Sequence, residues 1–277
     1  MKTSAAAICA DLRNVPPIPA IAAKLLTLLS DDKVGTHAVA ELLGSDTALT
    51  ARLLHEANLA RYGRPGSRRE VRGSIDLVGL DRTRQLIVLH ATAGYASRAP
   101  SHAELQCCWR HSLATAVMAD RVAEACGSFT KIAFTAGILH DIGRLGLMIA
   151  FPRHYMEAVR GASGRYLDLL DFEREEFGMD HAEAGRFLAE TWNLPVEFRT
   201  VAERHHDAAE GAELNLLRIV HCACQLADSL GFGVVAPPAE CDVRRILDGL
   251  PAEIGEKIAG TAEELRADVE ERMSAVL

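Results

Sequence analysis

Residues 132–150 read IAFTAGILHDIGRLGLMIA, which is the most apolar stretch of the sequence. The stretch is nearly as long as a membrane-spanning helix, but His140, Asp141 and Arg144 interrupt it. We therefore predict a buried core helix and not a membrane span. An unpaired carboxylate inside such a helix would be penalised strongly by desolvation, so another group must compensate the charge of Asp141.

The flanking sequence predicts helices throughout. Apolar residues recur at helical spacing after the prolines at 16, 17 and 19, and again after the cap candidates Ser45 and Asp46. The two stripes are Ile21, Leu25, Leu28 and Leu29, and then Leu49, Leu53, Leu54 and Ala57. No convincing run alternates as a strand would, and aromatic residues make up only 5%. We therefore predict an all-α fold.

Composition narrows the classes of partner. The chain has 277 residues, with 30 Lys and Arg against 38 Asp and Glu, for a net charge of −8. Because no overall positive field follows from this balance, we expect neither general nucleic-acid binding nor a membrane association. Hydrophobic residues make up 49%, as in ordinary globular domains, which argues against disorder.

The cysteines and the N-terminus predict a cytoplasmic location. The seven cysteines are an odd number and include no Cys-x-x-Cys pair, so we expect reduced thiols that mostly fill the core. The apolar start of the chain is interrupted by Asp11 and Arg13 before an export signal could develop.

Turn-rich segments predict three parts. We expect an N-terminal helical subdomain at 1–100, a second helical bundle at 101–235 and a C-terminal helical tail at 236–277. The hinge between the first two is placed at 97–101, which contains Pro100. The tail is predicted to be charged and solvent-facing.

An arginine-rich segment, RYGRPGSRR at 61–69, lies inside the first part. Its arginines could converge with Arg72 on a phosphate-bearing partner, or the segment could be a solvated surface loop. The surface loop is favoured because the segment offers no defined cradle for an anion.

Histidines on apolar helix faces suggest a buried polar site. Asp180 and Glu183 have the spacing of a capping box, and His181 lies on the apolar stripe of the helix that follows. His205 continues the apolar face of the next helix, and His206 is about 100° further round it. The pair would approach a cavity from two directions, as two neighbouring metal ions would require.

Two further residues complete the set of candidate site residues. Asp228 is predicted late in a helix spanning 216–230, and His111 near the start of a helix with apolar residues at 113, 117 and 122. The candidate metal ligands are His111, His140, Asp141, His181, His205, His206 and Asp228. Imidazole with carboxylate suits one or two ions of Mn, Fe or Zn, whereas Ca and Mg prefer oxygen ligands. A hydrogen-bonded polar core is the alternative for any one residue, but the whole set favours metal.

These seven residues, in this order, resemble the metal-binding set of the HD phosphohydrolase superfamily and of its HD-GYP branch of cyclic di-nucleotide phosphodiesterases. Other motifs are closer to the HDOD family, a degenerate branch of that superfamily. They are PPIP at 16–19, DTAL at 46–49, LVGL at 77–80, WRHS at 109–112, GILHDIG at 137–143 and WNLP at 192–195. The resemblance implies an all-helical bacterial signalling module, regulatory and without demonstrated catalysis.

Departures from the active branch bear on catalysis. No Gly-Tyr-Pro follows His206, and Arg144 stands where active phosphodiesterases have lysine. Arginine can clamp a phosphate but does not readily give up a proton. The change from lysine to arginine therefore preserves electrostatic binding of a phosphate better than it preserves acid catalysis.

Three functions follow in order of preference. The first is a cytoplasmic regulatory protein that contacts a signalling partner, with a pocket for metal and a phosphate-bearing small ligand. The second is a metal-dependent phosphohydrolase acting on a phosphate ester or cyclic nucleotide, in which Asp141 would bridge two metals and Arg144 would steady the phosphate. The third is nucleic-acid binding through the arginine-rich segment.

Overall fold

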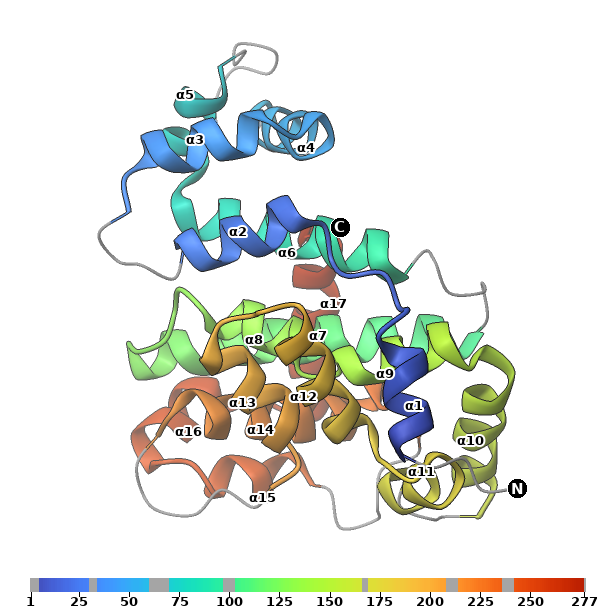
Figure 1. Cartoon of the computed structure of the whole chain (residues 1–277). Coiled ribbons are helices and arrows are strands. Elements are labelled where there is room, and N and C mark those ends of the chain that lie inside the picture. The colour runs from blue at the N-terminus through green and yellow to red at the C-terminus, as the bar shows by residue number, and fades with distance from the viewer. Residues whose placement is uncertain are drawn as a thin grey trace. The chain divides into compact units, whose positions relative to one another are not determined.

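The computed structural model is helical in every regular element that it describes, which confirms the predicted all-α class (Figure 1). It describes residues 5–29, 34–59, 70–96, 103–165, 169–207, 214–235 and 242–276. The chain divides into two compact units, residues 17–95 and residues 1–16 with 96–277.

The smaller unit contains α2 (Ala20–Leu29), α3 (Thr36–Gly44), α4 (Thr47–Ala57), α5 (Val71–Val78) and α6 (Leu80–Ala96). Asp46 caps α4 as predicted, because its carboxylate accepts hydrogen bonds from the amides of Ala48 and Leu49, both at 2.9 Å. Leu49 and Leu53 of the predicted stripe are buried in its core. The arginine-rich segment at 61–69 and the predicted hinge at 97–101 lie outside the described residues.

The larger unit is built around the long helix α7 (Ala103–Cys126), on which α8, α14, α16 and α17 pack. The helix α12 packs on α9 and α13. The other helices of this unit are α1 (Ala5–Leu12), α8 (Ala133–Leu139), α9 (Ile142–Ala150), α10 (Pro152–Arg165), α11 (Leu169–Phe177), α12 (His181–Thr191), α13 (Val196–Arg204), α14 (Leu216–Ala227), the π-helix η2 (Asp228–Phe232), α15 (Val243–Asp248), α16 (Ala252–Ile258) and α17 (Ala262–Val276).

Both ends of the chain depart from the predicted division at 100 and 235. The first helix belongs to the larger unit, since Ile8 and Leu12 are buried and α1 contacts α9 and α12 (Figure 1). The tail was expected to face solvent, but α17 packs on α7. Leu265, Val269 and Met273, spaced four residues apart, form the buried stripe that its many charges obscure in the sequence.

The apolar stretch at 132–150 lies in the core, but as two helices. In the described residues it is the segment with the length and composition of a membrane span, and 89% of the window 133–150 is buried inside the protein. The prediction of one continuous helix is wrong, because the chain turns at His140 and Asp141 between α8 and α9. Asp141 has φ −98° and ψ 21°, outside the helical region, and its side chain does not cap α9. Its carboxylate is therefore available to other partners.

Glycines allow the helix backbones around this turn to approach closely. A Cβ atom on Gly143 would lie 1.9 Å from the carbonyl oxygen of His181, and one on Gly137 would lie 2.5 Å from Cα of Ala116. The contact of α9 with α12 and that of α8 with α7 therefore require the absence of a side chain.

We predict that Gly143→Ala lowers the free energy of unfolding by about 3 kcal/mol or more, because backbone atoms, unlike the end of a side chain, cannot move aside. Gly94→Ala is the matched control, since Gly94 is exposed in α6 with open space around its Cα. It should stabilise the protein by up to about 1 kcal/mol. Denaturant unfolding of both variants measures the difference, and a Gly143→Ala protein as stable as the wild type would contradict this packing.

Candidate metal centre

The carboxylate of Asp141 is the centre of a cluster of histidines. Nε2 of His181 and Nε2 of His205 each lie 3.3 Å from Oδ1. On the other side, Nε2 of His111 and Nε2 of His140 each lie 3.6 Å from Oδ2. None of these five residues is more than 2% exposed. The structure thus brings together residues from α7, the α8–α9 turn, α12 and the end of α13.

The other ring nitrogen of these histidines is turned outward onto an acceptor. Nδ1 of His140 lies 2.6 Å from the carbonyl of Gly137, and Nδ1 of His181 lies 2.6 Å from the carboxylate of Glu173. Nδ1 of His205 lies 3.2 Å from the carbonyls of Val201 and Ala202. A neutral ring carries one proton, and these acceptors place it on Nδ1. Each Nε2 therefore presents a lone pair to Asp141.

Lone pairs that face a carboxylate are unfavourable unless a cation or a donating water molecule lies between them. Among the described residues, both oxygens of Asp141 and Nε2 of His205 have no hydrogen-bond partner. Protonation of the rings is opposed by burial, which lowers the pKa of His140 and of His205 below the ordinary histidine value. A metal ion satisfies all of these atoms at once, so the residues present fit a metal site.

The candidate ligands form two groups that meet at Asp141. One consists of Asp141, His181, His205 and His206, and the other of His111, His140 and Cys224. Two nitrogens that share an ion at about 2.1 Å lie about 3.0 to 3.4 Å apart for angles of 90° to 109°. The Nε2 atoms of His111 and His140 are 3.2 Å apart, within this range.

Arg144 lies behind Asp141. It is only 6% exposed, and its Nε lies 2.6 Å from Oδ2 of Asp141. Burial alone would raise the pKa of Asp141, but the guanidinium of Arg144 holds it well below its usual value. The carboxylate therefore stays charged. The sequence suggested that Arg144 could steady a phosphate, whereas its guanidinium is here buried against the carboxylate.

His206 and Asp228 lie at the edge of the cluster. His206 is exposed as a residue, although its Nε2 lies 2.8 Å from Nε2 of His181. Asp228 lies late in the helical run predicted at 216–230, at the point where α14 passes directly into the π-helix η2. Its Oδ1 lies 3.3 Å from Nδ1 of His111, the nitrogen turned away from His140. Asp228 therefore faces His111 from the outer side, although Nδ1 of His111 makes no hydrogen bond to any described residue.

Glu173 is a site residue that the sequence reasoning missed. It is fully buried, and its carboxylate accepts from the backbone amide of His181 at 2.7 Å and from the hydroxyl of Tyr155 at 2.5 Å, in addition to Nδ1 of His181. In the sequence it stands in an acidic run that resembles a solvent-exposed face. The available signal was its spacing with Leu169 and Phe177, which form the buried stripe of α11.

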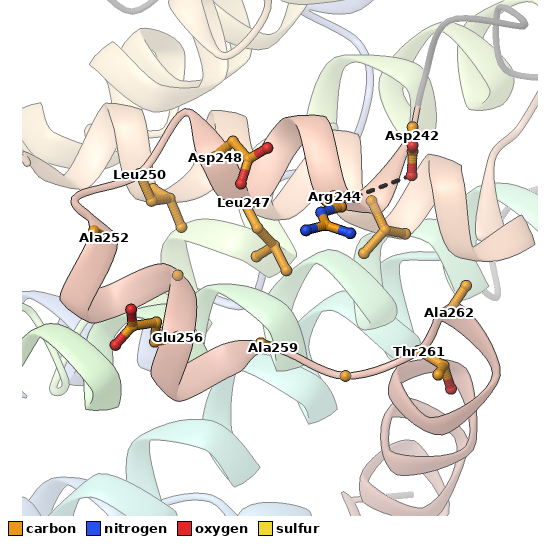
Figure 2. A pocket seen from close by; sticks show the side chains of 13 residues that line it. Asp242, Arg244, Leu247, Asp248, Leu250, Ala252, Glu256, Ala259, Thr261 and Ala262 are labelled. Carbon is orange, nitrogen blue, oxygen red and sulfur yellow. Dashed lines mark hydrogen bonds between the residues drawn. The ribbon is translucent and has the colours of Figure 1, made fainter.

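A separate concavity of about 610 Å³ lies among α15, α16 and the start of α17 (Figure 2). The described residues that line it include Arg244, Leu247 and Glu256, but no histidine or cysteine. None of the predicted site residues lines it. It is not the metal centre.

Comparison with known proteins shows the family to which this chain belongs. The family model of the HDOD domain matches residues 15–208, which is more than half of the chain. The chain belongs to the HDOD domain family. The match extends through His206 and ends before Cys224, Asp228 and the C-terminal helices.

Solved structures share the fold of this HDOD chain. An HDOD domain protein of unknown function from Geobacter sulfurreducens superposes with a TM-score of 0.76 at 24% identity, covering 97% of this chain and 95% of that one. A protein from Marinobacter aquaeolei, provisionally named a signal transduction protein, has a TM-score of 0.70 at 20% identity, covering 95% and 59%. One from Shewanella amazonensis, provisionally named a metal-dependent phosphohydrolase, has 0.60 at 19%, covering 98% and 97%.

A curated relative is longer than this HDOD chain. An uncharacterised protein of Treponema pallidum is 26% identical over 213 residues, which are 76% of this chain. The chain spans 41% of the length of that relative. At these identities the structural likeness establishes the fold, and the activity must be argued from the site.

Glu173→Gln should weaken metal binding by about 10- to 100-fold, because the loss of its charge frees the ring of His181. Glu176→Gln on the same helix is the matched control, since Glu176 is exposed. Competition with a chelator of known affinity measures both variants. Wild-type affinity in Glu173→Gln would contradict an orienting role.

The metal-free protein should lose stability as the pH falls below the ordinary histidine pKa of 6.5. Below this value the unfolded chain binds protons that His140 and His205 exclude in the fold, because their folded-state pKa values are lowered. The expected slope is about 1.4 kcal/mol per pH unit for each ring. Denaturant unfolding with chelator present, from about pH 7 down to pH 5, measures it. A flat profile would show that the folded rings are protonated.

Proposed function

We propose that this HDOD protein is a cytoplasmic regulator that holds one or two transition-metal ions around Asp141 and acts by contact with a signalling partner, without efficient catalysis. One observation carries the proposal. Four histidines, His111, His140, His181 and His205, direct Nε2 toward a buried carboxylate whose oxygens lack hydrogen bonds within the described part of the chain.

Iron, manganese and zinc fit this set of imidazole and carboxylate ligands. When bound, the ion supplies positive charge that offsets Asp141 and links α7, α12 and α13 to the α8–α9 turn. Occupancy can therefore shift the population of helix arrangements, and through it a surface that a partner protein recognises.

Burial of the cluster favours regulation over turnover. A substrate phosphate must reach the reacting centre, yet Asp141, the four histidines around it and Arg144 are all at most 6% exposed. The members of the candidate set that reach the surface are His206, which is exposed, and Asp228, whose side chain is 34% exposed. A phosphate-bearing small ligand could bind at this edge and sense the metal without being cleaved.

A metal-dependent phosphohydrolase is the second candidate. It is favoured by the position of Asp141, whose two oxygens face different histidine groups, as a carboxylate bridging two metals would require. The provisional name of the Shewanella protein agrees with it. The two functions differ in one measurable property, which is turnover.

We predict that the purified protein contains transition metal and that added Mn, Fe or Zn raises its melting temperature. Ligand at about 100 times its Kd stabilises a protein by about 2.7 kcal/mol. His206→Gln should weaken this effect without unfolding the protein, because His206 is exposed. His154→Gln, which replaces an exposed histidine of α10, is the matched control. Well under one equivalent of metal, with no thermal shift, would refute the proposal.

Turnover is tested on the metal-loaded protein with cyclic di-GMP and simple phosphodiesters. We expect binding at most, and no multiple turnovers. A double variant, His140→Ala with Asp141→Ala, removes the centre of the site. Multiple turnovers by the wild type that vanish in this variant would make the phosphohydrolase the correct function.

A further inference from the structure

We propose that Cys224 is a metal ligand, bound as a thiolate in the half of the site that contains His111 and His140. This inference rests on the proposed metal-binding function and adds the ligand that determines which metal the site prefers. Cys224 lies in α14 and is 4% exposed. Its Sγ lies 3.6 Å from Nε2 of His111.

The orientation of His111 selects Cys224 over Asp228. Nε2 of His111 faces Nε2 of His140 at 3.2 Å and Sγ of Cys224, whereas its Nδ1 faces Asp228 at 3.3 Å. An ion shared by the two histidines therefore lies on the side of the ring that faces the thiol. Asp228, one helical turn after Cys224, lies on the opposite side of the ring and makes no hydrogen bond to Nδ1.

A second, independent atom points into the same space. Oδ2 of Asp141 lies 3.6 Å from Nε2 of His111 and from Nε2 of His140. Asp141 is 1% exposed, and Oδ2 makes no hydrogen bond to any residue that the structure describes. Two nitrogens and one carboxylate oxygen thus lie close together, and the ligand atoms of His111, His140 and Cys224 all lie within 4.8 Å of one another.

The separations suit tetrahedral coordination. With zinc bonds of about 2.3 Å to sulfur and about 2.1 Å to nitrogen, the two atoms lie about 3.6 Å apart at the tetrahedral angle. This is the separation of Sγ and Nε2 of His111. The three ligands His111, His140 and Cys224, none more than 4% exposed, would leave the fourth tetrahedral position to another group.

The thiolate makes the site selective. On binding, the S–H bond of Cys224 breaks, its electron pair forms the bond to the metal, and the proton passes to solvent. Thiolate sulfur favours zinc, iron or cobalt over manganese and magnesium, which prefer oxygen. We therefore assign the half of the site that contains His111, His140 and Cys224 to a borderline or soft divalent metal.

Cobalt substitution of the full-length chain tests the assignment without an activity assay. The metal-free wild type, loaded with Co²⁺, should show the thiolate-to-cobalt charge-transfer absorption in the near ultraviolet, and Cys224→Ser should lose it. Zinc affinity should fall at least about tenfold in Cys224→Ser, and the preference for zinc over manganese should narrow.

Cys222→Ser is the matched control, because Cys222 lies on the same helix, is also buried, and has a thiol whose pKa burial raises to about 12. It should keep both the absorption and the affinity. Cobalt bound by the wild type without this absorption would overturn the inference and leave the proposed function standing, whereas a wild type that binds no metal would refute both. If Cys224→Ser does not fold, the spectra of the wild type and of Cys222→Ser decide.

Discussion

The charge of Asp141, which is only 1% exposed, is the constraint on which the site depends. Desolvation of a carboxylate costs several kcal/mol, and removing one partner of such a buried pair leaves the other charge uncompensated. Arg144 supplies one compensating charge from behind, at 2.6 Å. The neutral histidines in front add no charge and turn lone pairs toward the carboxylate. A cation between them would meet these lone pairs, which supports the proposed metal site over a hydrogen-bonded core.

Helix packing brings the cluster together. The absence of side chains at Gly143 and Gly137 lets α9 approach α12 and lets α8 approach α7, and these contacts carry Asp141 to His181 and to His111. The outer acceptors then set two of the rings: Glu173 for His181 and the Gly137 carbonyl for His140. In the proposed metal site, affinity therefore depends on residues that touch no metal, as well as on the ligands themselves.

The sequence predicted the all-helical class, the capping of α4 and α12, and the inward position of His181 and His205, all of which follow from local spacing. It did not predict the break at His140 and Asp141, because an apolar run carries no signal that distinguishes one helix from two. The buried stripe of α17 was hidden by the charges between its apolar residues. Glu173 was missed because a buried acid in an acidic run has the composition of a surface.

The sequence by itself thus determined which side chains have the chemistry to bind metal, since residue type and helical period are local properties. Only the tertiary structure decided which of these side chains contact one another. Which nitrogen of His111 faces Cys224 and which faces Asp228, and whether Arg144 meets a phosphate or Asp141, depend on contacts between helices far apart in the chain. Periodicity fixes the face of a helix on which a residue lies, but not the partner that packs against that face.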